Sequence, residues 1–339
     1  EGITFTLTGK LHVAQRLDAF GVDYIEGGYA GSNPKDMEFF REASRLGLRR
    51  ARLVAFGSTR RARRRAEEDE GLNALLEAGT GTVAIFGKSW RLHVREVLRT
   101  SEEENLRMIA DSVRRLKAAG REVIYDAEHF FDGWRDSSEY AARTLAAARE
   151  AGADVLVLCD TNGGTMPHEI EAMVAEVVRR FGGRIGIHAH NDSELAVANS
   201  IAAVRAGATH LQGTINGFGE RCGNANLVSL IPNLVLRMGC TCLRPDALRE
   251  LKAVSEFVYE MADIRPYSRQ PFVGDSAFAH KAGVHADAVR KCPRAYEHVD
   301  PALVGNERRI LVSELSGSSN VFLKAVEMGL AMDRDSPDV

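Results

Sequence analysis

Two histidines one residue apart, His188 and His190, are the part of this sequence best suited to chemistry. They lie in the segment Ile187-His188-Ala189-His190-Asn191-Asp192, whose composition predicts a strand that ends in a polar turn. Because side chains alternate along a strand, both imidazoles project from the same face. Neutral imidazole nitrogens ligate divalent metals, so the pair predicts a shared metal site. A pair of half-buried, hydrogen-bonded histidines is the alternative.

The composition is typical of a globular protein with a large core. Of 339 residues, 45% are hydrophobic and 27% are charged. A net charge of -3 gives no reason to expect nucleic acid or an anionic membrane surface as a partner, and the apolar runs are too short to cross a bilayer. The five cysteines form no framework of spacings, and no secretory signal is apparent. These features favour a reducing, cytoplasmic compartment.

Apolar segments that alternate with helical patterns set the architecture. Strands are predicted at residues 22–28, 53–56, 83–86, 123–125, 155–158, 185–190 and 210–215. The helical patterns between them include residues 103–119, 138–151, 167–180 and 195–206. A strand followed by a helix, repeated every 25 to 40 residues or so, is typical of βαβ units and a parallel sheet.

Polar residues at the ends of these strands favour a barrel over a doubly wound sheet. A doubly wound sheet is expected to carry Gly-x-Gly-x-x-Gly after an early strand, whereas the glycine-rich segment 217–223 has another spacing and follows the last strand. A TIM barrel keeps its active site at the carboxyl ends of its strands. The polar residues found there are Glu26, Asp126, Glu128, Asp160, Thr161, His188, His190, Asp192 and Asn216. Since seven strands are counted, we expect an α/β fold, a (β/α)8 TIM barrel whose first strand lies upstream of Glu1.

The barrel rhythm stops near residue 240. We predict a catalytic barrel over residues 1–240 and an appended helical subdomain over residues 241–339. The helices expected in the subdomain cover residues 248–261, 277–288 and 313–328. Within the barrel, the basic run 60–65 is followed at once by acidic residues, which favours a solvated helical face over an anion-binding patch.

The chemistry these residues allow is metal-assisted carbonyl chemistry. A metal with open coordination positions polarises a carbonyl group as a Lewis acid. Glu128 is placed to transfer a proton, or else to form a structural ion pair. Thr161 is placed to bind a substrate carboxylate, or else to cap the next helix. These side chains do not by themselves define the reaction.

At this point the sequence resembles a known family. The segment 188–192, followed by Leu-Ala-Val-Ala-Asn at 195–199, is similar to the His-x-His strand of the metallolyase barrels that include 2-isopropylmalate, homocitrate and citramalate synthases. Gly-Glu-Arg-Cys-Gly-Asn at 219–224 matches the family's Gly-Glu-Arg-x-Gly-Asn segment. Segments 125–130, 160–164 and 212–217 most resemble the citramalate synthase branch. The resemblance extends from about residue 1 to residue 321.

The resemblance implies an acyltransferase that carries out a Claisen-type condensation. A divalent metal (Mg, Mn or Zn) would bind a 2-oxo acid, pyruvate in this branch, and polarise its ketone. Acetyl-CoA, the co-substrate, would lose a methyl proton and attack, and hydrolysis of the thioester would release CoA and citramalate. This reaction belongs to isoleucine biosynthesis. For metal binding the resemblance implies His188, His190 and Asn224, and for the substrate carboxylate it implies Thr161.

The same resemblance implies further residues and a partner subunit. Glu128 and Glu220 match active-site acids of the family. His285 and Tyr296, in the appended segment, match residues that reach into the barrel of a partner subunit. A homodimer is therefore implied. A surface histidine on a helix and a core tyrosine are the alternatives for these two residues.

The sequence departs from the family's pattern at its start. The family's first strand ends in Arg-Asp-Gly, whose Asp ligates the metal and whose Arg contacts the substrate, and the sequence begins after this motif. One alternative is therefore an inactive truncated fragment. A second alternative is a 2-isopropylmalate synthase acting on 2-oxoisovalerate. A third is a metal-dependent hydrolase barrel, although such barrels usually carry His-x-His on their first strand.

Overall fold

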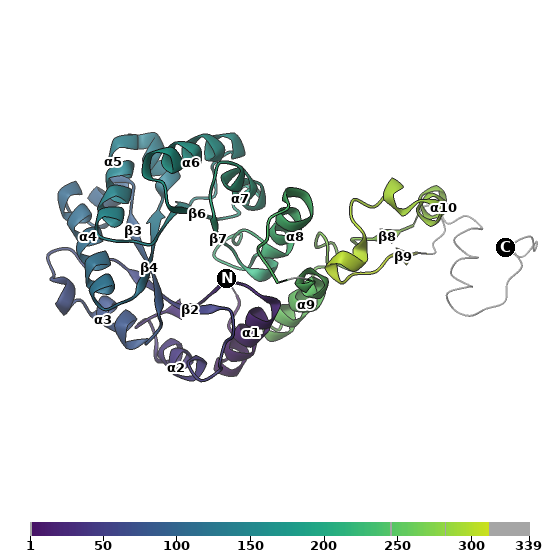
Figure 1. Cartoon of the computed structure of the whole chain (residues 1–339), viewed down its shortest axis with the longest axis horizontal. Coiled ribbons are helices and arrows are strands. Elements are labelled where there is room, and N and C mark those ends of the chain that lie inside the picture. Colours follow the sequence, from purple (N-terminus) through teal and green to yellow (C-terminus); the bar gives the residue numbers. More distant parts are fainter. Residues whose placement is uncertain (1, 245, 282, 312–339) are drawn as a thin grey trace, which may run out of the picture.

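Seven parallel strands form one curled sheet in the order in which they occur along the chain (Figure 1). The computed structural model describes residues 2–244, 246–281 and 283–311. The strands are β1 (Tyr24–Tyr29), β2 (Arg52–Ser58), β3 (Thr82–Lys88), β4 (Glu122–Glu128), β5 (Val155–Asp160), β6 (Arg184–Ala189) and β7 (His210–Gln212). Each of the seven predicted strands is present close to its predicted bounds, which confirms the prediction of repeated βα units in a parallel sheet.

Helices surround the sheet on its outer face, as Figure 1 shows. They are α1 (Leu7–Phe20), α2 (Pro34–Ala43), α3 (Glu70–Glu77), α4 (Glu102–Ala118), α5 (Phe130–Glu150), α6 (Pro167–Phe181), α7 (Ala196–Arg205) and α8 (Leu227–Met238). Several begin at a side chain that accepts a hydrogen bond from the first turn, for example Ser101 from Glu104 N. Helix α1 ends at Gly21, which adopts the left-handed conformation at φ 104° that glycine accommodates without strain.

Alternation along the strands divides the apolar residues into two layers. Val54, Ala84 and Ile124 belong to a cluster inside the curl of the sheet. Their neighbours Val83 and Val123 face outward and belong to the larger cluster between the sheet and the helices. This period of two is what a sheet closed toward a barrel requires, because its inner and outer faces are both buried.

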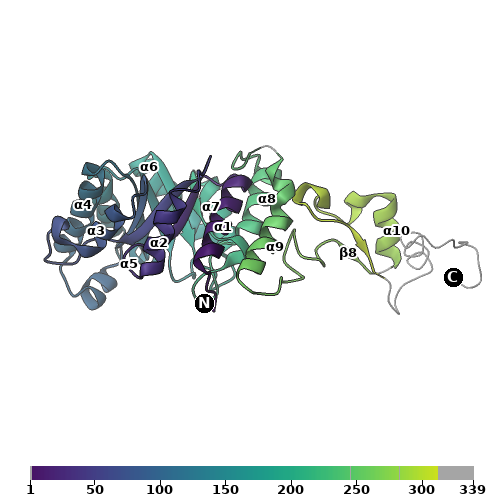
Figure 2. The ribbon, with the colours of Figure 1, turned by 90° about the horizontal axis from the view of Figure 1, so that it is seen from below.

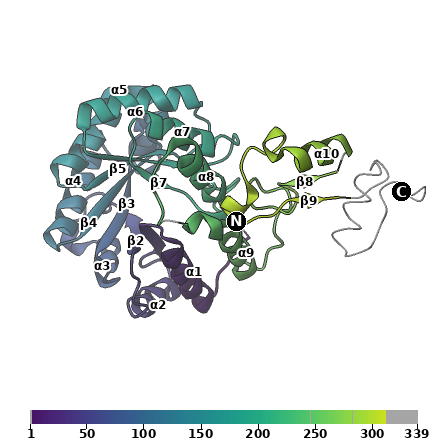
Figure 3. The same cartoon turned by 45° about the vertical axis from the view of Figure 1, so that its right-hand side comes forward.

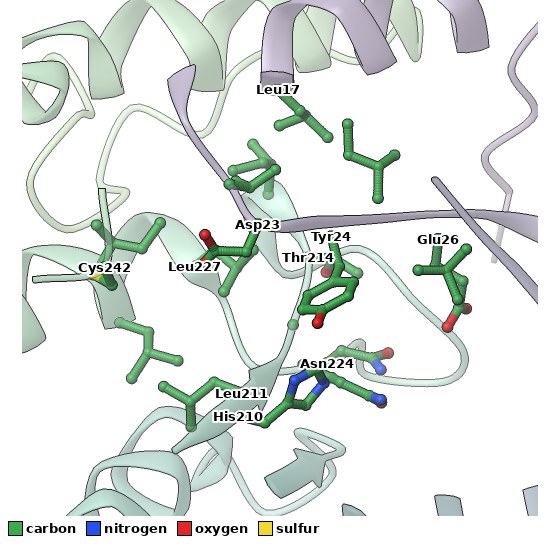
Figure 4. A pocket seen from close by; sticks show the side chains of 18 of the residues that line it. Leu17, Asp23, Tyr24, Glu26, His210, Leu211, Thr214, Asn224, Leu227 and Cys242 are labelled. Atoms are coloured by element: carbon green, nitrogen blue, oxygen red, sulfur yellow. The ribbon is translucent and has the colours of Figure 1, made fainter. Parts of the chain in front are cut away.

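One strand position of the ring is open. Within the part of the chain that the structure describes, no hydrogen-bonded ladder joins β7 to β1. The two strands border a cavity of about 830 Å³, which Figure 4 shows from close by. Its lining is largely apolar and includes Leu17 of α1, Leu211 of β7 and Leu227 of α8. The fold is therefore a (β/α) barrel of seven strands with a gap where an eighth would close it, as the sequence predicts.

The residues beyond the barrel form a helix that packs on it and an arm that extends away (Figures 2 and 3). Helix α9 (Leu251–Met261), after a 3-10 turn at Ala247–Glu250, shares a hydrophobic cluster with Phe20 of α1 and Val228 of α8. The arm consists of the described residues of 279–311, with β8 (Ala279–His280), α10 (Gly283–Lys291) and β9 (Arg309–Ile310). The domain boundary at residue 240 stays a prediction.

Two predictions of local structure are wrong. The helix expected over 277–288 starts only at Gly283, because Ala279–His280 pairs with Arg309–Ile310 as a short parallel sheet. The basic run 60–65 forms no helix, and the side chain of Arg60 is buried. Its guanidinium binds Glu104 Oε1 at 2.9 Å and Asp111 Oδ2 at 2.8 Å, both on α4. The helix expected at 313–328 lies outside the described residues.

A single carboxylate ties the amino ends of the strands together. Glu122 of β4 accepts hydrogen bonds from Tyr24 Oη and Thr82 Oγ1, each at 2.9 Å. It also accepts from Arg52 Nη1 at 2.8 Å and from Arg184 Nη1 at 2.9 Å. Burial alone would raise the pKa of Glu122, but these donors together lower it to about 2. Five strands of the ring, β1 to β4 and β6, therefore meet at one charge.

Replacing this carboxylate is expected to lower stability in a pH-dependent way. Because the folded pKa of about 2 lies below the ordinary value of 4.5, the contribution is present above pH 4.5 and is lost as the pH falls toward 2. We expect Glu122→Gln to lower the free energy of unfolding by about 1–2 kcal/mol at pH 7, a value reduced for solvent screening, and by much less at pH 3. Urea unfolding at both pH values measures this.

Glu176→Gln is the matched control, since Glu176 is an exposed carboxylate on α6 that binds Arg179 of its own helix. It is expected to leave the free energy of unfolding nearly unchanged at either pH, because exposed ion pairs contribute little. If Glu122→Gln lowered the free energy of unfolding equally at pH 7 and pH 3, the stabilising role assigned to the negative charge of Glu122 would be wrong.

Candidate active site

The two histidines lie together at the carboxyl end of β6. Their ring centroids are 5.0 Å apart, which confirms that both project from one face. His188 lies within the strand, and His190 follows it. The backbone N–H of His190 donates to Asp160 O of β5 at 3.2 Å. Strand β5 therefore fixes the backbone of His190, one residue beyond the end of β6.

Both imidazoles are in an environment that favours their neutral form. Burial lowers the pKa of His188. Burial, and then the neighbouring His188 ring, lowers the pKa of His190 to about 4. His188 contacts Gln212 Oε1 through Nδ1 at 2.7 Å and Asn224 Nδ2 through Nε2 at 2.8 Å. His190 Nδ1 is buried and has no hydrogen-bond partner among the described residues.

These observations fit part of a metal site. Two neutral imidazoles and a buried, unpaired ring nitrogen are what a divalent cation would satisfy. The structure also brings the third predicted residue, Asn224, into contact with His188. Across residues 2–244, 246–281 and 283–311, no group of three His, Cys, Asp or Glu side chains could hold a metal. The ligand roles of the three residues stay predictions.

The loop between β7 and α8 is pinned against the end of β6 by its backbone. Ala225 N donates to Ala189 O at 2.9 Å, and Asn191 N donates to Gly223 O at 2.9 Å. Glycine is required at 223, where φ is 90° and a Cβ would lie 1.9 Å from Gly217 O. At Gly219 a Cβ would lie 1.8 Å from Asn224 Oδ1. The glycines of this segment therefore let Asn224 reach His188.

Arg221 joins three loops at this end of the barrel. Its Nε and Nη2 donate to the two carboxylate oxygens of Asp192 at 2.7 and 2.9 Å. The same Nη2 donates to Thr161 O at 2.6 Å. The loops after β5, β6 and β7 are thus fixed to one another. The adjacent Glu220 has a side chain that is 78% exposed and lies 3.9 Å from the Arg221 guanidinium, so its role as an acid stays a prediction.

Thr161 and Glu128 lie at the ends of neighbouring strands and are both held by other side chains or backbone. Thr161 Oγ1 accepts a hydrogen bond from His129 N at 2.9 Å. Because that oxygen accepts from the backbone, its own proton is left to donate to a ligand. Glu128, the last residue of β4, forms an ion pair with Lys88, the last residue of β3. The ion pair that the sequence offered as an alternative for Glu128 is therefore present.

Three aromatic residues that the sequence analysis did not single out form a wall beside Glu128. His129 lies in the left-handed region at φ 56°, and its ring centroid is 4.0 Å from that of His93. Trp90 stacks on His93 with centroids 5.5 Å apart. Burial, and then the His129 ring, lowers the pKa of His93. The sequence could have indicated these residues by their position, because they follow the carboxyl ends of β3 and β4.

Gln212 and Asp126 connect the histidines to the barrel interior. Gln212 Nε2 donates to Asp126 Oδ1 at 3.0 Å, while Gln212 Oε1 contacts His188. Burial, and then the charge of Glu26, raises the pKa of Asp126 well above its usual range. Glu26 of β1 and Asn224 both line the open cavity (Figure 4). The sequence placed Asp126 at a strand end but predicted no role for either it or Gln212.

His285 and Tyr296 lie on the arm rather than beside the two histidines of β6. Their ring centroids are 4.4 Å apart. His285 is exposed, and Tyr296 is 46% exposed. The arm stands apart from the barrel in the views of Figures 1 and 3. Their predicted insertion into a partner subunit stays a prediction.

Comparison with known proteins identifies the family. The HMGL-like family matches residues 1–258, and the family described as homocitrate synthase post-HMGL domain-like matches residues 272–338. The chain therefore belongs to the HMGL-like family. No helix in residues 2–244, 246–281 and 283–311 is long and apolar enough to cross a membrane.

Among the relatives is the (R)-citramalate synthase of Sulfolobus acidocaldarius, 53% identical over 99% of this chain and 65% of that protein. The 2-isopropylmalate synthase of the same organism is 33% identical over 98% of this chain and 83% of that protein. The chain spans 63–65% of the length of the citramalate synthases it matches. In fold it is similar to the HMG-CoA lyase of Bacillus subtilis, with a TM-score of 0.61, 22% identity, and coverage of 78% of this chain and 89% of that one.

Removing the Arg221 guanidinium is expected to loosen the loops that it joins. A bidentate Arg–carboxylate pair contributes on the order of 1 kcal/mol locally. We therefore expect Arg221→Gln to speed amide hydrogen exchange in segments 161–164 and 191–194 by about fivefold. Exchange followed by mass spectrometry measures this.

Arg179→Gln is the control, because it removes a bidentate pair with Glu176 that lies on the surface of α6. Its exchange in segments 161–164 and 191–194 is expected to equal that of the unaltered protein. Unchanged exchange in Arg221→Gln as well would show that Arg221 does not hold these loops.

Proposed function

We propose that the protein acts as a citramalate synthase, an acyltransferase that condenses acetyl-CoA with pyruvate and releases citramalate and CoA. The observation that carries this proposal is the 53% identity to an (R)-citramalate synthase over 99% of the chain. The contact between His188 and Asn224 at the strand ends supports it, since the condensation needs a site that polarises a ketone.

His188, His190 and Asn224 would hold a divalent metal in this proposal. Mg, Mn and Zn each accept mixed nitrogen and oxygen ligands in some geometry. When bound, the ion would act as a Lewis acid on the ketone of the 2-oxo acid. The lowered pKa values of both histidines support this use, because only the neutral ring offers a lone pair to a cation.

Side chains of the protein would bind the substrate carboxylate and transfer the proton. Thr161, whose oxygen is already engaged by His129 N, donates its hydroxyl proton to the carboxylate of the 2-oxo acid. Glu128 accepts a proton from the methyl group of acetyl-CoA, with Lys88 compensating its charge beforehand. The new carbon–carbon bond forms between that methyl carbon and the ketone carbon. Water then cleaves the thioester, and CoA leaves as the thiol.

The proposal includes the wider organisation of the protein. Separate family matches at residues 1–258 and 272–338 support a catalytic barrel followed by a further unit, close to the division predicted at residue 240. The exposed pair of His285 and Tyr296 on the arm supports a homodimer in which the arm meets the barrel of a partner subunit. A cytoplasmic location fits the five free cysteines.

A 2-isopropylmalate synthase acting on 2-oxoisovalerate is the second candidate. The identity to such an enzyme is 33%, against 53% for the citramalate synthase of the same organism. The two substrates differ by a methyl group against an isopropyl group, and pockets grade such differences by about 1–3 kcal/mol. Pyruvate is therefore the proposed substrate.

Release of free CoA thiol from acetyl-CoA tests the reaction directly. With divalent metal, we expect thiol release to depend on pyruvate and to exceed that with 2-oxoisovalerate by about tenfold or more in kcat/KM. Prior treatment with a chelator is expected to abolish it, and added metal to restore it. A preference for 2-oxoisovalerate would establish the second candidate. Absence of thiol with every 2-oxo acid, both in this chain and in one that carries a family-type first strand with Arg-Asp-Gly, would overturn the condensation.

The Thr161 hydroxyl gives a sharper prediction for the substrate site. A hydrogen bond to a charged group contributes about 1.5–3 kcal/mol, so Thr161→Val is expected to lower kcat/KM for pyruvate by about 10- to 100-fold. Thr161→Ser keeps the hydroxyl and is expected to retain most of it. The KM for acetyl-CoA serves as the internal control and is expected to stay the same. Equal losses in Thr161→Val and Thr161→Ser would assign the effect to packing.

A further inference from the structure

We propose that Gln212 is a positioning residue, anchored by Asp126, that fixes which nitrogen of His188 carries the proton and leaves Nε2 free for a divalent cation. The inference rests on the proposed function and adds to it. It assigns a role to the side chains of Gln212 and Asp126, which contact each other inside the barrel. A ligating histidine is commonly oriented by a group on its other ring nitrogen, and here that group is an amide.

Three contacts in a row define the arrangement. Asp126 Oδ1 lies 3.0 Å from Gln212 Nε2, Gln212 Oε1 lies 2.7 Å from His188 Nδ1, and His188 Nε2 lies 2.8 Å from Asn224 Nδ2. All three have the same direction. Gln212 Nε2 donates to Asp126 Oδ1, so the amide N–H of Gln212 faces Asp126 and its oxygen faces the ring. That oxygen accepts from Nδ1–H, and Nε2 is left with its lone pair.

The opposite direction would prevent ligation. If the Gln212 amide were turned, its N–H would donate to His188 Nδ1, and the ring proton would move to Nε2. The nitrogen that faces Asn224 and the end of the barrel would then have no lone pair. Asp126 favours the observed direction, because its Oδ1 accepts the amide N–H of Gln212 at 3.0 Å.

The backbone holds this arrangement in place before any ligand arrives. His188 and Gln212 are register partners on the adjacent strands β6 and β7, so their side chains lie side by side on the inner face. Asp126 enters from β4 and is only 4% exposed. Since water has little access to it, a lost contact with Gln212 is not replaced cheaply. His190 Nδ1 has no such partner among the described residues, so the orienting device belongs to His188.

Gln212→Leu tests the role because leucine has a similar size and makes neither contact. Nitrogen-15 NMR of the histidine side chains in the metal-free protein reports which ring nitrogen of His188 carries the proton. We expect the unaltered protein to show the Nδ1–H form and Gln212→Leu to lose this preference. We also expect Gln212→Leu to bind Mn²⁺, measured by electron paramagnetic resonance titration, about 10- to 100-fold more weakly.

Gln270→Leu is the matched control, since Gln270 is a buried glutamine that contacts Ser229, outside this row of contacts. It is expected to leave both measurements unchanged. An unchanged His188 tautomer together with unchanged Mn²⁺ affinity in Gln212→Leu would overturn the proposal.

A reversed pair tests the direction of the contacts and serves even if Gln212→Leu fails to fold. In the double variant Asp126→Asn with Gln212→Glu, the new amide donates to the new carboxylate, which still accepts from His188 Nδ1–H. We expect it to recover Mn²⁺ binding to within about threefold of the unaltered protein, an energy difference of about 0.7 kcal/mol. Gln212→Glu alone places a second carboxyl group against Asp126. Its Mn²⁺ binding is expected to stay weaker than that of the double variant. Equal binding by the single and double variants would also overturn the proposal.

The outcomes separate this proposal from the proposed function. If the unaltered protein binds no divalent metal, the proposed function fails, and the tautomer of His188 in the metal-free protein still decides the role of Gln212. If the unaltered protein binds metal and Gln212→Leu binds it equally well with the same tautomer, only the role of Gln212 fails.

Discussion

Parallel pairing in a continuous register is the constraint on which the site depends. The register of β3 with β4 sets Lys88 beside Glu128, and that of β6 with β7 sets His188 beside Gln212. A slip of one residue in either ladder would turn one member of each pair to the outer face. At the amino ends of the strands, opposite the end that carries the histidines, Glu122 of β4 binds residues of β1, β2, β3 and β6.

Much of the fold was predictable because it depends on local pattern. The seven strands are short apolar runs separated by amphipathic helices, and this pattern needs no knowledge of distant contacts. Features that depend on distant partners were not predictable. Arg60 is buried because α4 offers Glu104 and Asp111 to it. Ala279–His280 is a strand because Arg309–Ile310, some thirty residues later, pairs with it.

In the candidate site, too, features set by local pattern were predictable and features set by distant partners were not. Alternation along one strand was enough to place His188 and His190 on one face, and the match at 219–224 to the family's Gly-Glu-Arg-x-Gly-Asn segment singled out Asn224. The donor state of Thr161 could not be predicted, because it depends on the backbone N–H of His129 from another loop. The orientation of the Gln212 amide depends likewise on the carboxyl group of Asp126, three strands away along the sheet. Sequence pattern thus locates side chains, whereas their hydrogen-bond polarity comes from the tertiary structure.

The open position between β1 and β7 has a consequence for the backbone at the two strand edges that border it. Each of the two strands presents backbone donors and acceptors that no strand in the described part of the chain satisfies, and the hollow beside them is mainly apolar. Such edges template strand addition from other chains, which closed barrels avoid. The seam between β1 and β7 is therefore where a further strand would find both backbone hydrogen-bond partners and an apolar surface to cover.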